Sequence, residues 1–204
     1  EPLRLAIGMY GGNIDFYDIK GVADALLKTI RIYDCDYVRT SDSNAFDEAS
    51  AFHPGRSAVI LKDGKAIGIL GEIHPDVAEN YGIEVKVYAA KLNVPEMLKL
   101  SEKEVTYKPM PKFPATTRDL SLICDDNLPA ASIEKAIKKA AGKVLEKVTL
   151  FDVYKGKQIE EGKKSISYSI SMRSHDGTLT DEQADSVMKK VLKALKDIGA
   201  DLRM

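Results

Sequence analysis

The sequence has no tryptophan and only two cysteines in 204 residues. Cys35 and Cys124 lie far apart without a Cys-x-x-Cys spacing, whereas zinc sites and disulfide frameworks need clustered or paired cysteines. We therefore expect two free, packed thiols in a reducing, cytoplasmic setting. The sequence also lacks an apolar run of roughly 18 residues, the length that crosses a bilayer, and no signal peptide opens it. We predict no membrane association.

Signatures of catalytic and metal sites are also missing. The glycines of residues 8–12 and 155–157 do not form the Gly-x-x-x-x-Gly-Lys loop that cradles phosphate, and no Gly-x-Ser-x-Gly motif is present. His53, His74 and His175 share no ligand spacing with a cluster of acidic residues or cysteines. We predict that they lie at strand or turn ends, and we assign no catalytic residue, metal ligand or cofactor to this segment.

Charge is distributed unevenly along the chain. Residues 1–105 contain 12 Lys and Arg against 17 Asp and Glu, whereas residues 106–204 contain 18 against 14. A basic second half is compatible with a polyanionic partner. The excess is small, however, and a solvated, lysine-rich surface is the simpler interpretation of the charge alone.

Residues 101–114 predict a linker between two domains. The segment is charged and contains three prolines, which lack a backbone donor and favour extended geometry in the residue before them. We place the boundary near Lys108, with a first domain over residues 1–105 and a second over residues 109–204. The first residue is Glu1 rather than Met, so we expect a piece of a longer protein.

The first domain is expected to be a mixed sheet with helices, and it looks incomplete. Asp63-Gly64 is a two-residue hairpin signal, because both residues tolerate positive φ. The predicted elements are a strand over residues 3–10, a helix capped by Asp18, strands over residues 57–62 and 65–73, a short helix after Pro75 and a strand over residues 85–94.

The second domain shows the order β-α-β-β-α-β, which predicts an α+β fold of the ferredoxin-like, split βαβ type. Both helices would then cover one face of the sheet. The predicted elements are strands over residues 118–124, 148–154 and 165–173, a last strand over residues 201–204, a helix with Pro129 in its first turn, and a helix opened by a capping box at Thr180.

The strand over residues 165–173 alternates strictly between apolar residues and serines, which indicates one buried and one wet face. Tyr154 ends the preceding strand and Ser165 begins this one, so the two should lie close across the hairpin. If Phe151 and Val153 face the helices, Tyr154 lies on the open face, and Arg173 shares that face.

An exposed tyrosine beside small hydroxyls is a plausible platform for a nucleic-acid base. Stacking on an aromatic ring holds a splayed base by about 1–3 kcal/mol, and serine hydroxyls can donate to or accept from a base edge. A merely solvated sheet face is the alternative interpretation of the same pattern.

Several strings in the second half closely resemble the ferredoxin-fold anticodon-binding domain of phenylalanyl-tRNA synthetase. They are FPATTRDLSL at 113–122, LFDVYKG at 150–156, EGKKSISYSISMR at 161–173 and TLTDEQ at 178–183. Upstream, FYDIKGVADALL at 16–27, FHPGRSA at 52–58 and GEIHP at 71–75 resemble the end of the catalytic-like domain of the β subunit in the bacterial enzyme. The resemblance spans nearly the whole chain.

The resemblance implies binding of tRNA(Phe) and a partner, the catalytic α subunit, in an α2β2 ligase that uses ATP and Mg²⁺. It also implies that the first domain is a class II synthetase-like core without catalytic residues, and that the magnesium ligands and editing site lie upstream of this segment. Of the residues that would contact tRNA, Tyr154 and Ser165 match the family motifs. The further candidates are Arg118, Ser167, Arg173 and Lys155, the last as a phosphate contact.

Two other function classes fit a ferredoxin-like domain. One is a small-molecule regulatory module that senses an amino acid, and the other is a purely structural subunit-contact module. The acidic first half beside a basic second half favours RNA over a sensor.

Overall fold

The structure is a computed structural model that describes residues 2–102, 104, 107, 109–174 and 176–203. It divides the chain into two compact units, Glu1–Tyr107 and Lys108–Met204. The predicted boundary residue Lys108 and parts of the predicted linker lie outside the described residues. Each unit is described separately below.

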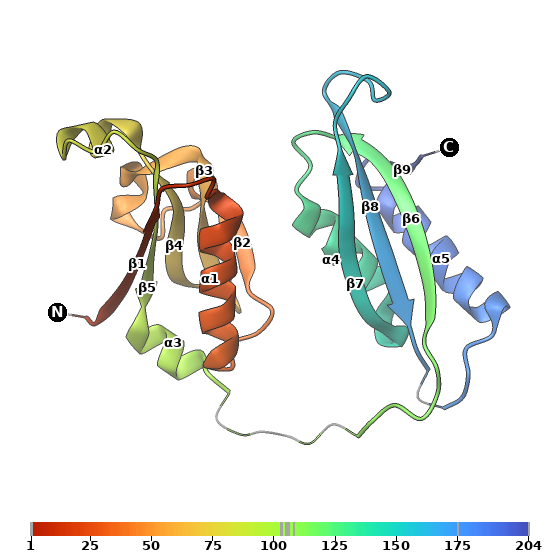
Figure 1. The fold of residues 1–204 in the computed structure, drawn as a ribbon. Coiled ribbons are helices and arrows are strands. Elements are labelled where there is room, and N and C mark those ends of the chain that lie inside the picture. The colour runs from red at the N-terminus through yellow and green to blue at the C-terminus, as the bar shows by residue number, and fades with distance from the viewer. Residues whose placement is uncertain (1, 103, 105–106, 108, 175, 204) are drawn as a thin grey trace. The chain divides into compact units, whose positions relative to one another are not determined.

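The first unit consists of one sheet with helices against it (Figure 1). Its strands are β1 (Arg4–Tyr10), β2 (Asp36–Arg39), β3 (Phe52–Lys62), β4 (Lys65–Ile73) and β5 (Val87–Asn93), and its α-helices are α1 (Phe16–Thr29), α2 (Pro75–Asn80) and α3 (Val94–Leu100). The strand β2 and the helix α3 were not predicted.

The sheet of the first unit is antiparallel, so the prediction of a mixed sheet was wrong. The strands lie in the order β1-β5-β4-β3-β2, and neighbouring strands in this order pair antiparallel. A helical crossover such as α1 often returns the chain beside the strand it left, which gives a parallel pair. Here α1 instead carries the chain to β2 at the opposite edge of the sheet, and β5 pairs with β1.

Local sequence signals account for two features of this unit. Asp63 and Gly64 have φ of 50° and 76°, which confirms the predicted hairpin turn between β3 and β4. The cap of α1 is Asp15 rather than Asp18: the Asp15 carboxylate accepts from the Asp18 backbone N–H, and the Asp18 side chain accepts from the Asp15 N–H. The helix therefore begins one turn earlier than predicted.

The second unit has the predicted order β-α-β-β-α-β. Its elements are β6 (Thr116–Asp125), α4 (Ala130–Ala141), β7 (Leu145–Tyr154), β8 (Lys163–Met172), α5 (Asp181–Lys196) and β9 (Ala200–Leu202). The strands form an antiparallel sheet in the order β7-β8-β6-β9. Pro129 is the cap of α4 rather than part of its first turn, and the capping box at Thr180 is confirmed.

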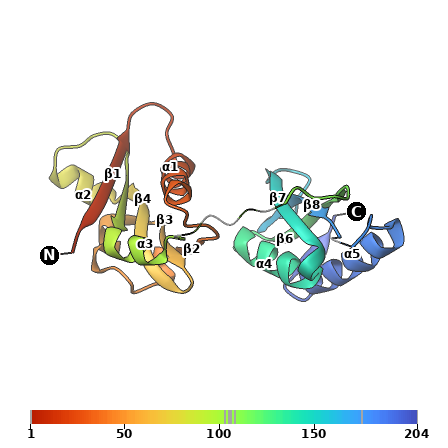
Figure 2. The same ribbon diagram turned by 90° about the horizontal axis from the view of Figure 1, so that it is seen from below.

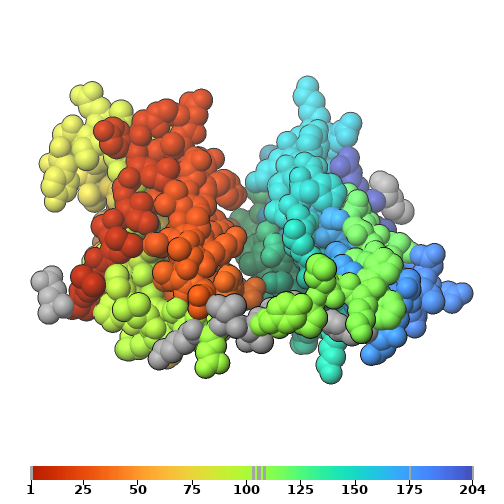
Figure 3. Space-filling view, turned by 60° about the horizontal axis from the view of Figure 1, so that its bottom comes forward, coloured from red at the N-terminus to blue at the C-terminus, as the bar shows by residue number. Residues whose placement is uncertain are grey.

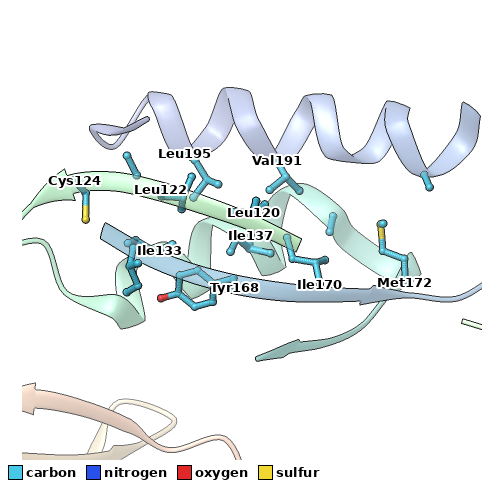
Figure 4. Packing of buried hydrophobic residues seen from close by; sticks show 14 of the residues in the cluster. Leu120, Leu122, Cys124, Ile133, Ile137, Tyr168, Ile170, Met172, Val191 and Leu195 are labelled. Atoms are coloured by element: carbon cyan, nitrogen blue, oxygen red, sulfur yellow. The ribbon is translucent and has the colours of Figure 1, made fainter. Parts of the chain in front are cut away.

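Both helices of this unit lie on the same face of the sheet (Figures 1 and 2). The core lies between them and the sheet, where β6 contributes Leu120 and Leu122 and β8 contributes Tyr168 and Ile170 (Figure 4). Burial of each large apolar side chain of this kind stabilises the fold by about 1.5–3 kcal/mol. The helix face of β8 is thus the apolar half of the alternation, as predicted, and the serines lie on the other face.

The strand β7 contains two irregularities that change its alternation. Its register against β8 shifts between Leu145 and Lys147 and again between Leu150 and Asp152, so that Glu146 and Phe151 are extra residues. Phe151 is 57% exposed, and as the extra residue of a bulge it departs from the alternation on which its place beside the helices was assumed. A bulge of this kind places two residues opposite one and shifts the alternation that a periodic reading assumes.

Candidate nucleic-acid interface

One face of the second sheet carries no helix (Figure 1). On that face cross-strand partners form rows, and two rows near the β7–β8 hairpin form the candidate site. Antiparallel partners share a face. The first row runs from Tyr154 through Ser165 and Ile123 to Asp201, and the second runs from Asp152 through Ser167 and Ser121 to Arg203. We call these two rows the open-face site.

Tyr154 lies at the β7 edge of this site. It pairs with Ser165, as expected, and its side chain is 37% exposed. The ring is held against the hairpin loop, because a Cβ built on Gly156 would lie 2.3 Å from the Tyr154 hydroxyl. The loop is at the surface of the unit (cyan in Figure 3).

Ser165 lies at the floor of the site rather than on a wet surface. The residue is 1% exposed, and its hydroxyl accepts a hydrogen bond from Arg203 Nη1 at 3.4 Å. Arg203 Nη2 donates to Gln158 Oε1 in the hairpin loop at 3.3 Å. The Arg203 backbone N–H donates to the Ser121 carbonyl at 2.8 Å, which continues the pairing of β9 with β6 by one residue.

Ser167 is also buried, at 5% exposure, and its hydroxyl lies 2.8 Å from that of Ser121. The wet face expected from the serine alternation is therefore partly covered at its centre. Ser165 and Ser167 are thus buried beneath neighbouring side chains, with Tyr154 paired to Ser165 on β7 and the Arg203 guanidinium bonded to the Ser165 hydroxyl. Asp152 and Asp201 add carboxylates to the same two rows.

The Arg173 guanidinium bonds groups of its own chain. Its Nε donates to Glu146 Oε1 at 2.9 Å, and its Nη1 donates to the Phe113 carbonyl. The guanidinium holds the pKa of the Glu146 carboxyl below its usual range. Arg173 therefore ties the start of β7 to the chain that enters β6, away from the open-face site.

Arg118 lies on the opposite face from Tyr154 and Ser165. It pairs with Ile170, a core residue of the helix side, and its Nη2 donates to Asp181 at the start of α5 at 2.6 Å. The structure does not bring Arg118 to the open-face site. The signal was available in the sequence, because Arg118 has the same parity as the apolar Leu120.

Lys155 follows Tyr154 in the hairpin and forms an ion pair with Asp126. The ammonium lowers the pKa of the Asp126 carboxyl. Lys164, by contrast, donates to the backbone carbonyls of Asp126 and Leu128. The charge of Lys155 is thus beside the site but partly neutralised by its own chain.

Sequence reasoning missed Arg203, Asp152 and Phe151. Arg203 could have been found from the alternation of β9, since Ala200 is buried and residues of opposite parity face the other side. The position of Phe151 could not have been predicted from the sequence, because it depends on the bulge in β7. At the other bulge the extra residue, Glu146, accepts a hydrogen bond from the Ser171 hydroxyl on the open face.

Comparisons with known proteins match both halves of the chain. Residues 111–203 match the family described as ferredoxin-fold anticodon binding domain, and residues 1–94 match the phenylalanyl tRNA synthetase beta chain CLM domain. The chain belongs to the phenylalanine–tRNA ligase β subunit family.

Curated relatives carry the same name. The chain is 42% identical over 200 residues to a protein of Clostridium acetobutylicum, 44% over 204 residues to one of Clostridium tetani and 36% over 185 residues to one of Bacillus subtilis, each called phenylalanine–tRNA ligase beta subunit. These alignments cover 98%, 100% and 90% of this chain but only 24%, 25% and 22% of the relatives. The chain thus spans about a quarter of the length of the ligase β subunits it matches.

His53 and His74 of this ligase family member cap turns. His53 Nδ1 accepts from the Gly55 N–H and His74 Nδ1 from the Asp76 N–H, as expected for turn-end residues, and the two rings stack with centroids 6.4 Å apart. His175 lies outside the described residues. Within the described ranges, no three His, Cys, Asp or Glu side chains gather as a possible metal site.

Both cysteines are free, and burial raises the pKa of the Cys35 and Cys124 thiols. A raised pKa disfavours the nucleophilic thiolate, which agrees with plain packing. None of the helices described is long and apolar enough to cross a membrane.

Proposed function

We propose that the second unit binds the anticodon stem-loop of tRNA(Phe) through the open-face site, and that the first unit is a non-catalytic scaffold within an α2β2 phenylalanine–tRNA ligase. The observation that carries the proposal is the pairing of Tyr154 with the buried Ser165, with Arg203 above the serine. The match of residues 111–203 to an anticodon-binding family supports it.

The geometry suits bases that are turned out of the loop. Tyr154 offers an aromatic surface for stacking. Ser165 and Ser167 are small and buried, with hydroxyls that already bond Arg203 and Ser121. A base edge can bond the Ser165 hydroxyl when the Arg203 side chain turns from the serine to the base. Arg203 presents a planar guanidinium that can stack on a base or donate to its acceptors.

The charge of the site favours contacts with bases over contacts with phosphates. Asp152 and Asp201 lie in the same two rows as Arg203, and carboxylates repel phosphate while accepting hydrogen bonds from base amino groups. Lys155, in the adjacent loop, is the candidate phosphate contact. Its pair with Asp126 weakens its field.

The proposed roles of the first unit, the cofactors and the location rest on the family match. We propose that the first unit is a class II synthetase-like core that packs against the catalytic α subunit, with the boundary between the domains near Lys108. ATP and Mg²⁺ serve the whole enzyme, at residues outside this segment. We propose a cytoplasmic location, as suits a tRNA ligase.

The test compares intact α2β2 ligase with its Tyr154→Ala and Ser165→Ala variants, using tRNA(Phe) and the same tRNA with a changed anticodon. We expect each substitution to weaken binding of tRNA(Phe) but not of the anticodon variant. Thr149→Ala is the control, because Thr149 lies on the same face, opposite Ser169 and outside the site. Equal losses with both tRNAs would show that the site does not read the anticodon.

A further inference from the structure

The space above Gly156 is occupied by a ring. A Cβ at this position would lie 2.3 Å from the Tyr154 Oη, 2.5 Å from its Cζ and 3.1 Å from its Cε1. Real Cβ atoms do not approach other heavy atoms so closely, so any side chain at residue 156 must displace the Tyr154 ring.

The backbone itself does not call for glycine here. Gly162, in the same hairpin loop, has φ of 82°, a conformation that favours glycine. Gly156 is absent from the residues with positive φ, so another residue could adopt its backbone conformation. What glycine supplies at position 156 is room.

We propose that Gly156 is a positioning residue for tRNA binding, which lets the Tyr154 ring rest on the hairpin loop in the orientation that stacks a base. The inference rests on the proposed function and deepens it. A tyrosine that is already held loses less side-chain entropy when a base stacks on it, and this is the gain from pre-organisation.

The displaced Tyr154 ring can rotate into solvent, so a substitution of Gly156 should affect the ring without unfolding the unit. Tyr154 is 37% exposed and ends an edge strand, so it can rotate toward solvent without disturbing the core beneath β8. An alanine at position 156 should therefore move the platform and leave the unit folded.

The experiment measures tRNA(Phe) affinity of the intact ligase with Gly156→Ala, alone and combined with Tyr154→Ala. We expect Gly156→Ala to weaken binding by up to the loss from Tyr154→Ala, about fivefold to hundredfold, and to cause no further loss in the Tyr154→Ala background. Gly177→Ala is the matched control, because its Cβ meets nothing within 4 Å and its φ is not positive. Losses that add in the double variant would overturn the proposal.

A second measurement is independent of tRNA. The aromatic NMR signals of Tyr154 in the chain of residues 1–204, assigned with Tyr154→Phe, should shift in Gly156→Ala and stay in place in Gly177→Ala. Unshifted signals in Gly156→Ala would refute the positioning role. If Tyr154→Ala leaves tRNA affinity unchanged while the signals shift, the proposed function fails and the positioning of the ring stands.

Discussion

Arg203 donates a hydrogen bond to the hydroxyl of Ser165 at 3.4 Å, although Arg203 directly follows β9 and Ser165 lies on β8, two strands that do not pair with each other. Strand β6 separates them in the sheet, and the long arginine side chain reaches across it. The guanidinium is also held by Gln158 of the hairpin loop. Arg203 thus joins a site whose other residues lie on the β7–β8 hairpin, on β6 and on β9.

Arg203→Ala should weaken binding of tRNA(Phe) by roughly 1.5–3 kcal/mol, the value of a hydrogen bond from a charged donor. Arg203→Lys keeps the charge but loses the planar fork, so it should recover only part of the affinity. Filter binding with the intact ligase measures both. Full recovery by lysine would show that the charge alone acts.

Tyr154→Ala should weaken binding by about 1–3 kcal/mol, the contribution of one stacked base. The slope of log affinity against log salt concentration should hardly change, because no phosphate contact is lost. Tyr154→Phe keeps the stacking ring and should stay within a few-fold of the wild type. A flattened slope in Tyr154→Ala would mean that the residue contacts the backbone instead.

Lys155→Ala should flatten the salt slope by less than one unit, because Asp126 already neutralises part of the lysine charge. Asp126→Asn provides the reciprocal test. It frees the ammonium and should steepen the slope and tighten binding at low salt. If neither variant changes the slope, Lys155 does not contact a phosphate.

Arg118→Ala should leave tRNA affinity unchanged, because the side chain pairs with Asp181 and Asp185 on the helix side of the sheet. The lost ion pair is exposed, so the melting temperature should fall only slightly. Affinity and melting curves on the same preparation separate the two effects. A clear loss of tRNA affinity in Arg118→Ala would show that Arg118 contacts tRNA.

Residues 109–204 should fold on their own, since their core is contributed by their own elements. Ile137 is fully buried in that core, and Ile137→Ala should lower the free energy of unfolding by about 2–5 kcal/mol. Urea unfolding of the fragment provides the measurement. Non-cooperative unfolding of the wild-type fragment would contradict independent folding.

The sequence alone determined the order of elements in the second unit and the two faces of β8. Alternation with period two depends only on the pleat of one strand, and the capping box at Thr180 and the turn at Asp63-Gly64 depend on neighbouring residues. The proximity of Tyr154 and Ser165 also followed from the sequence, because a hairpin brings its two strand ends together.

Only the tertiary structure decided which other residues join that pair. The bulge at Phe151 arises from pairing with β8, and the place of Arg203 from the short β9 pairing with β6. The strand order β1-β5-β4-β3-β2 likewise depends on contacts between residues far apart in the chain. Such pairings are selected by burial and hydrogen bonding across the whole sheet, and no local pattern carries them.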